Sequence, residues 1–162
     1  MFVFVAHTDL DADFASETAL KLREAGHEAF TGEQIYRGFT LMSFSKQDIA
    51  KALRAADVLV AFGLNSLWHK YVTAEVAFFS GHTTHDRTIL VTTHDLDDRT
   101  PAYLLGRRLV YFDGDRAKAI DAVLNHVASI GISHRRAADQ IFLSYFALGV
   151  DREGEPVQRS LV

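Results

Sequence analysis

Residues 2–11 read FVFVAHTDLD, a short apolar run that gives way to polar residues where a helix is expected to begin. A second run, VLVAF over residues 58–62, is apolar at every position. Continuous apolar runs of this length are typical of strands that are covered on both faces, as in parallel sheets. The two stretches therefore predict an α/β domain with a central parallel sheet.

Strands and helices are predicted to alternate along the rest of the chain. The predicted strands cover residues 2–6, 28–31, 57–62, 88–92 and 108–112, and the predicted helices cover residues 11–25, 44–56, 70–80 and 115–130. The last helix has the clearest apolar stripe, at positions i, i+3, i+4 and i+7: Ile120, Val123, Leu124 and Val127. This order predicts a doubly wound, five-stranded parallel sheet of the flavodoxin-like type, with right-handed crossovers.

Glycines are expected where helices end. Gly26 is expected to stop the first helix, and Gly81 follows the third. The last helix is expected to end at Ile130, and a separate piece is expected after Gly131. Residues 1–130 are then predicted to form the α/β domain, and residues 131–162 an extra C-terminal helix with a polar tail. The extra helix is predicted from four residues at helical spacing: Ala138, Ile141, Phe142 and Tyr145.

The composition narrows the classes of function. The 162 residues carry a formal net charge of −4 and no run of basic residues, which argues against a nucleic-acid binder. There is no cysteine, so neither disulfides nor thiolate chemistry is possible. No stretch approaches the roughly 18 apolar residues of a membrane span, and the first apolar run is too short for a signal peptide. These observations predict a cytoplasmic protein with no nucleic-acid or membrane partner.

Several familiar motifs of doubly wound enzymes are absent. The sequence has no Gly-x-Gly-x-x-Gly fingerprint after the first strand, no Walker-type phosphate loop and no Gly-x-Ser-x-Gly elbow. Its histidines include two loop groups with plausible metal-ligand types: His82 with His85, and His94 with Asp95 and Asp97. Because these groups lack the i, i+4 helical spacing of zinc helices, neither a metal nor a cofactor is expected.

Polar residues follow the predicted strands where the strands end. His7 and Thr8 come after the first strand, Glu33 after the second, and Glu75 near the start of the helix after the third. Carboxyl ends of parallel strands lie at one edge of a sheet, so these residues predict a site there. The loop after the first strand can also offer backbone N–H groups to an anion. Two alternatives remain open: Thr8 or Asp9 caps the helix, and Glu75 lies on its solvent face.

A single carboxylate at this edge suits the cleavage of an N-glycosidic bond. The transition state is oxocarbenium-like, so a carboxylate beside the sugar stabilises the developing positive charge. A good leaving group such as nicotinamide needs no strong general acid. Trp68 and Tyr71 precede Glu75 and could stack on a base or a nicotinamide ring, or else belong to the core.

The order of these segments resembles that of TIR (Toll/interleukin-1 receptor) domains over about residues 1–130. VFVAHT at residues 3–8, followed by DADFA, looks like the opening strand of the family and the residues after it. GEQIYRG at residues 32–38 is similar to the BB loop, and YVTAE at residues 71–75 matches the Trp-x-x-x-Glu motif with tyrosine in place of tryptophan. The intervening segments GHEAF (26–30) and IAKALRAADVLV (49–60), and the run over 101–112, follow the family order.

The resemblance implies that Glu75 is catalytic, that Tyr71 shapes the pocket, and that Glu33 and the Thr8 region line the nucleotide site, with His7 and Trp68 as further substrate-binding candidates. Bacterial members with this glutamate cleave NAD, as a substrate, to nicotinamide and ADP-ribose or a cyclic product. The family also implies homo-oligomers formed through TIR–TIR contacts, a separate effector that senses the product, and antiphage defence signalling.

Two rival interpretations remain. LREAGHEAF at residues 22–30 and TAEVA at residues 73–77 also resemble nucleoside 2-deoxyribosyltransferases, which use a glutamate nucleophile at the same point of a related fold. Those enzymes carry an Asp-Gly loop ahead of that helix, whereas this chain has GLNSLWHK at residues 63–70, which favours the TIR interpretation. The second rival interpretation is a non-catalytic TIR interaction module.

Overall fold

The structure is a computed structural model that describes residues 1–31, 46–64, 70–93 and 107–147. The chain divides into two compact units, Met1–Val127 and Ala128–Val162. Within the ranges that the structure describes, no helix is long and apolar enough to cross a membrane.

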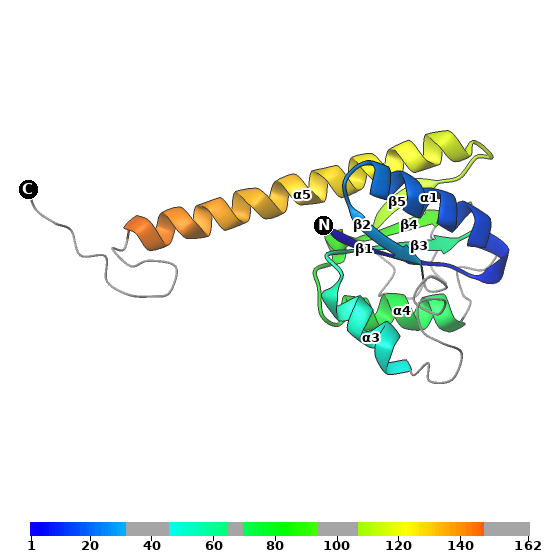
Figure 1. The fold of residues 1–162 in the computed structure, drawn as a ribbon, viewed down its shortest axis with the longest axis horizontal. Coiled ribbons are helices and arrows are strands. Elements are labelled where there is room, and N and C mark those ends of the chain that lie inside the picture. Colours follow the sequence, from blue (N-terminus) through cyan, green and yellow to red (C-terminus); the bar gives the residue numbers. More distant parts are fainter. Residues whose placement is uncertain (32–45, 65–69, 94–106, 148–162) are drawn as a thin grey trace, which may run out of the picture. The chain divides into compact units, whose positions relative to one another are not determined.

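The first unit is built on a five-stranded parallel sheet (Figure 1). Its strands are β1 (Phe2–Ala6), β2 (Glu28–Thr31), β3 (Val58–Gly63), β4 (Thr88–Thr92) and β5 (Arg108–Tyr111). The spatial order is β2-β1-β3-β4-β5, the order of flavodoxin-like folds. The predicted fold class is therefore confirmed, and the strand boundaries agree with the predicted ones to within one residue.

Helices cover both faces of the sheet (Figure 1). The helices are α1 (Ala12–Glu24), α3 (Lys46–Ala55), α4 (Lys70–Ser80) and α5 (Arg116–Ala147), with two short 3-10 turns, η1 (Asp9–Asp11) and η2 (His85–Arg87). In the first unit, α3 and α4 lie on one face, and α1 lies with the beginning of α5 on the other. The guanidinium of Arg116 joins the latter two helices, because it lies over the Phe14 ring at 5.3 Å and pairs with Glu17 at 3.6 Å.

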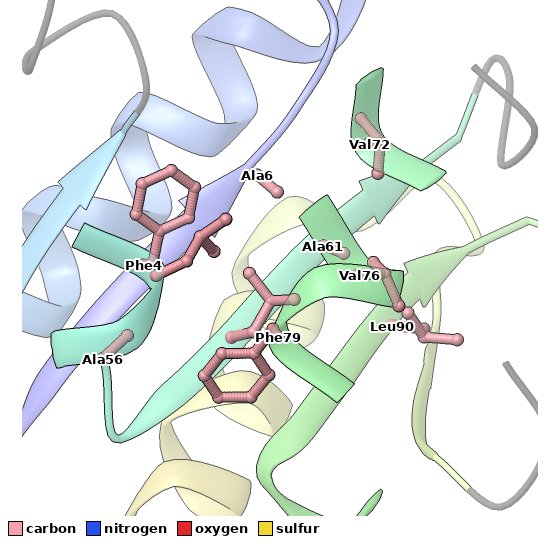
Figure 2. Close-up of a cluster of buried hydrophobic side chains, with 10 residues drawn as sticks. Phe4, Ala6, Ala56, Ala61, Val72, Val76, Phe79 and Leu90 are labelled. Atoms are coloured by element: carbon pink, nitrogen blue, oxygen red, sulfur yellow. The ribbon is translucent and has the colours of Figure 1, made fainter. Parts of the chain in front are cut away.

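The core on the α3 and α4 side consists of ten buried side chains (Figure 2). They come from three strands, from both helices and from the residue that follows α3: Phe4, Ala6, Leu53, Ala56, Leu59, Ala61, Val72, Val76, Phe79 and Leu90. All six residues of β3 are buried, as its continuous apolar run predicts for a central strand covered on both faces. Each large apolar side chain buried in this way contributes about 1.5–3 kcal/mol.

Gly26 and Gly131, which were both expected at the end of a helix, behave differently. Gly26 has φ +85° after α1, where the N–H of His27 donates to Leu22 O and the N–H of Gly26 donates to Arg23 O, both at 3.0 Å. This is a Schellman C-cap, so the predicted stop is confirmed. The predicted stop at Gly131 is wrong, because α5 continues to Ala147 as one helix, and the expected extra helix is its continuation. A lone glycine costs a helix only about 1 kcal/mol, and it carries no stop signal without capping partners.

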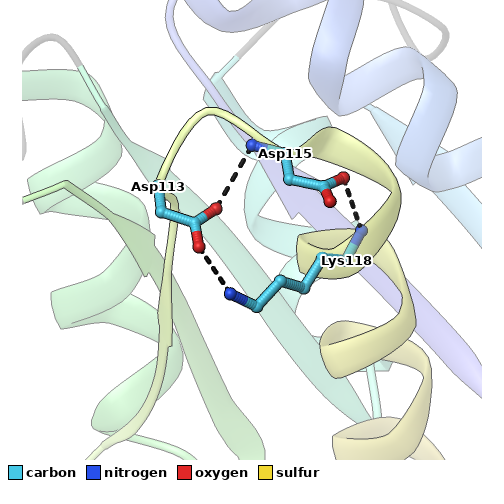
Figure 3. Close-up of polar contacts among 3 residues, drawn as sticks. All are labelled: Asp113, Asp115 and Lys118. Atoms are coloured by element: carbon cyan, nitrogen blue, oxygen red, sulfur yellow. Dashed lines mark hydrogen bonds and ion pairs between the residues drawn. The ribbon is translucent and has the colours of Figure 1, made fainter.

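The beginning of α5 is fixed by three residues (Figure 3). Asp113 accepts a hydrogen bond from the backbone N–H of Asp115 at 3.2 Å, and the Asp115 carboxylate accepts one from the backbone N–H of Lys118 at 3.1 Å. The Lys118 ammonium pairs with Asp113, which raises the pKa of Lys118 and lowers that of Asp113. Gly114, with φ +104°, makes the turn between the two aspartates, so a four-residue signal in the sequence sets the start of the helix.

Candidate functional site

The topology places the switch point of the sheet at the carboxyl ends of β1 and β3. The chain leaves β1 toward β2 on one side and later returns to β3 on the other, so these two neighbours form the switch point of the sheet. Their register pairs Ala6 with Ala61, which leaves His7 and Thr8 at the end of one strand and Gly63 at the end of the other. Open α/β sheets bind ligands at this position. It is the same edge at which the polar residues were expected to gather.

Helix α4 lies against this end of the sheet. Its buried residues Val72 and Val76 belong to the same cluster as Ala6 and Ala61, the paired residues near the ends of β1 and β3 (Figure 2). Glu75 lies between the two valines in sequence, so the packing that seats α4 also fixes the backbone of Glu75.

Glu75 occupies the flank of the buried stripe of α4. Val72, Val76 and Phe79 point into the core, whereas Ala74 and Ala77 are exposed. Glu75 is half-buried between these two sides. The alternative that it lies on a solvent face is therefore wrong, because the solvent face belongs to the alanines.

The electrostatics of Glu75 follow from this position. Burial raises the pKa of its carboxyl from an ordinary 4.5 to about 7. In the part of the chain that the structure describes, no hydrogen bond or ion pair to this carboxyl offsets the loss of water. At neutral pH the group is therefore close to its midpoint, where it can give or take a proton, and a bound cation would favour its ionised form.

The residues after β1 form a compact polar turn. Nδ1 of His7 lies 2.9 Å from the carbonyl oxygen of Thr8, and the Thr8 hydroxyl donates to Oδ2 of Asp11 at 3.2 Å. Thr8 and Asp11 are buried, with 9 % and 2 % of their surface exposed. The alternative that Thr8 or Asp9 caps the helix is wrong: Thr8 makes no side-chain cap bond to η1, and the residue before α1 is Asp11.

Asp11 is a member of the site region that was not among the predicted site residues. Its carboxylate is nearly inaccessible and fixes the orientation of the Thr8 hydroxyl. The spacing Thr8-x-x-Asp11 is the only sequence signal for this contact, and the same spacing is common in ordinary turns.

The side chains of the remaining predicted site residues lie outside the described part of the chain. Tyr71 lies in the first turn of α4 by its backbone, and its side chain lies outside the described residues. Glu33 and Trp68 also lie outside them, as does the BB-like segment. The structure thus brings Glu75 and the His7–Thr8 turn to the same end of the sheet.

The histidine groups show no metal centre within the described ranges, where no three His, Cys, Asp or Glu side chains could hold an ion together. His82 lies at the end of α4, where Nδ1 is 2.8 Å from the carbonyl oxygen of Phe78 and its ring lies 4.7 Å from the Phe78 ring. The second group, His94 with Asp95 and Asp97, and the side chain of His85 lie outside the described residues.

Comparisons with known proteins identify relatives of the fold only. No family model and no curated protein matches the chain. Among solved structures, a prokaryotic SEFIR domain is similar with a TM-score of 0.58 and 13 % identity, over 78 % of this chain and 91 % of that one. A 2-deoxyribosyltransferase from Bacillus psychrosaccharolyticus is similar with a TM-score of 0.52 and 15 % identity, over 74 % and 90 % of the two chains. The fold is thus of the flavodoxin-like type that SEFIR domains and a deoxyribosyltransferase share.

Proposed function

We propose that this chain cleaves an N-glycosidic bond, that Glu75 is the catalytic carboxylate, and that NAD is the substrate. The observation that carries the proposal is the half-buried Glu75 carboxyl beside the switch point, whose pKa burial raises to about 7. A carboxyl that is desolvated on a rigid helix at a ligand-binding edge is a functional-site candidate with a physical cause.

The chemistry needs little besides this carboxylate. The bond between the ribosyl C1′ and the nicotinamide nitrogen breaks, and its electron pair leaves with the ring as neutral nicotinamide. The positive charge that develops on the sugar is stabilised by the Glu75 carboxylate. Water then adds to C1′ and loses its proton through Glu75 to give ADP-ribose, or a nucleophilic atom of the same molecule adds and gives a cyclic product.

The raised pKa of Glu75 suits this substrate. The nicotinamide ring of NAD is cationic, and a cation near a carboxyl favours the ionised form. Substrate binding would therefore lower the pKa of Glu75 and supply the charged carboxylate at neutral pH, whereas the free enzyme holds a mixture of protonated and ionised forms.

Transfer of a deoxyribosyl group is the second candidate, favoured by the likeness to the 2-deoxyribosyltransferase structure. In that reaction Glu75 would attack C1′ as a nucleophile, and the departing base would need a proton because it leaves as an anion otherwise. NAD remains the favoured substrate because its leaving group needs no acid and because the order of the motifs follows the TIR pattern.

The wider role is also a proposal, supported by the TIR resemblance. The chain would work in the cytoplasm as a homo-oligomer formed through TIR–TIR contacts at the BB-like segment of residues 32–38. Its product would signal to a separate effector protein in antiphage defence. Specific activity that rises with protein concentration would support the assembly; constant specific activity from a monomer would remove it. A non-catalytic TIR interaction module remains the outcome if no substrate is cleaved.

The test is incubation of the purified protein with NAD, and separately with deoxyadenosine and a free acceptor base, with products resolved by chromatography. We expect nicotinamide and ADP-ribose species from NAD and no base exchange. Base exchange with NAD untouched would establish the second candidate, and inertness toward both would remove the enzymatic proposal. Glu28→Gln, at the exposed amino end of β2, is the matched control for Glu75→Gln.

A further inference from the structure

The polar groups at the carboxyl end of β1 are arranged as hydrogen-bond acceptors. The carbonyl oxygen of Thr8, 2.9 Å from His7 Nδ1, can only accept, so Nδ1 carries the proton in the neutral ring. Nε2 then holds a lone pair, and this atom is buried with no hydrogen-bond partner among the residues that the structure describes. A buried acceptor left unpaired is destabilising, and a donor on a ligand would satisfy it.

The Thr8 hydroxyl can also act toward a ligand only as a hydrogen-bond acceptor. Its proton is donated to Asp11 Oδ2 at 3.2 Å, so Oγ1 can offer a ligand only its lone pairs. Two backbone donors of the turn are also in use: the N–H of Asp11 donates to Thr8 O at 3.1 Å, and that of Ala12 donates to Asp9 O. The carboxylates of Asp9 and Asp11 add negative charge beside them.

These observations oppose the expectation that the turn holds an anion. A phosphate needs N–H or cationic donors, whereas the side chains of this turn offer lone pairs and carboxylates. A sugar hydroxyl provides the donor that Nε2 of His7 lacks.

We propose that the turn after β1 binds a ribosyl hydroxyl of the substrate rather than its phosphates, with His7 Nε2 as the acceptor. Asp11 is a positioning residue, since it turns the proton of the Thr8 hydroxyl away from the ligand. This inference rests on the proposed N-glycosidic function for the identity of the ligand. It states that the ribosyl part of a nucleotide faces the end of β1 and that the phosphates bind to other segments of the site.

The test uses the imidazole ¹⁵N signals of His7 in the whole protein. Three probes are titrated: nicotinamide riboside, adenosine and inorganic pyrophosphate. In the free protein we expect the tautomer protonated on Nδ1, with a pyridine-type Nε2 signal. Both ribosyl probes should move the Nε2 signal toward its hydrogen-bonded position, and pyrophosphate should leave it in place.

A pair of variants supplies the affinity readout. His7→Phe keeps a ring of similar size and removes the acceptor, so the dissociation constants of the ribosyl probes should rise about tenfold, the effect of one lost hydrogen bond. His27→Phe, a histidine beside the amino end of β2, should leave them unchanged.

The inference is overturned if the Nε2 signal follows pyrophosphate, if it stays unmoved by every ribosyl probe, or if His7→Phe binds them as the wild type does. Nicotinamide release by the wild-type protein is measured separately, so a protein that binds nucleosides without cleaving NAD would refute the proposed function and leave this contact standing.

Discussion

Individual polar groups at the two edges of the sheet differ in how they are paired. At the amino edge, Asp57 accepts a hydrogen bond from the backbone N–H of Phe2 at 2.8 Å, and buried Arg107 donates to the Ser80 hydroxyl at 2.7 Å. At the carboxyl edge, the Glu75 carboxyl is desolvated by burial, and Nε2 of His7 has no hydrogen-bond partner within the described ranges. In the described part of the amino edge, the Thr88 hydroxyl and the Nη1 atom of Arg107 are also buried without a hydrogen bond, although Nη2 of Arg107 is paired.

This difference separates groups that stabilise the fold from groups available for a ligand. A paired polar group lowers the free energy of the folded state, while a desolvated or unpaired one raises it. Unpaired groups persist where a ligand supplies the missing interaction, and proteins commonly lose stability at such sites. Substitutions at the amino edge should therefore change stability alone, and those at the carboxyl edge should change activity.

The largest expected effect is the loss of activity in Glu75→Gln. Glutamine keeps the size and hydrogen-bonding groups of the side chain but cannot carry the negative charge that stabilises the oxocarbenium ion. Removal of one such electrostatic group costs about 10²–10³-fold in rate or more. Nicotinamide release is measured beside the Glu28→Gln control, and equal turnover by the two variants would remove Glu75 from the reaction.

The same substitution should stabilise the protein at alkaline pH. The folded-state pKa of Glu75 is raised from 4.5 to about 7, so its contribution to stability is fully present below pH 4.5 and is lost as the pH rises through 7. Relative to Glu75→Gln, the wild type should lose about 2–3 kcal/mol between pH 5 and pH 8. Urea unfolding of both proteins at the two pH values measures this difference; a difference that does not change with pH contradicts the desolvation of Glu75.

Asp57→Ala, at the amino edge, should lower stability and leave activity unchanged. It leaves the Phe2 N–H without its acceptor, and the loss of a hydrogen bond to a charged group costs about 1–3 kcal/mol. Activity of the folded fraction should remain at the wild-type level. Asp57→Asn retains an acceptor and should recover part of the stability, and a large fall in turnover in either variant would break the separation of the two edges.

Gly26→Ala should have the smallest effect. The glycine has φ +85° in the turn between α1 and β2, and a Cβ there would meet no atom within 4 Å. The cost is therefore backbone strain alone, about 1 kcal/mol. The midpoint of thermal unfolding should fall by a few degrees without loss of nicotinamide release, and an unchanged midpoint would show that the turn tolerates a side chain.

The sequence predicts the fold well because its signals are local. The buried β3 run, the alternation of strands with helices and the stop at Gly26 each depend on a few neighbouring residues. The stop at Gly131 was wrong because a glycine ends a helix only when capping groups follow it.

The site is less predictable because it depends on tertiary packing. Ala74 and Ala77 give α4 little contrast between its faces, so the sequence could not decide whether Glu75 is exposed. Its pKa follows from the packing of α4 against the sheet, and the bond between Thr8 and Asp11 follows from the geometry of one turn.

The most direct test of the contrast between the edges is an NMR titration of the Glu75 side-chain carboxyl carbon in the free protein. A midpoint near pH 7 is expected, because burial opposes ionisation and no partner in the described part of the chain compensates. A midpoint near the ordinary 4.5 would contradict the account, since Glu75 would then be as well solvated or paired as the polar groups of the amino edge.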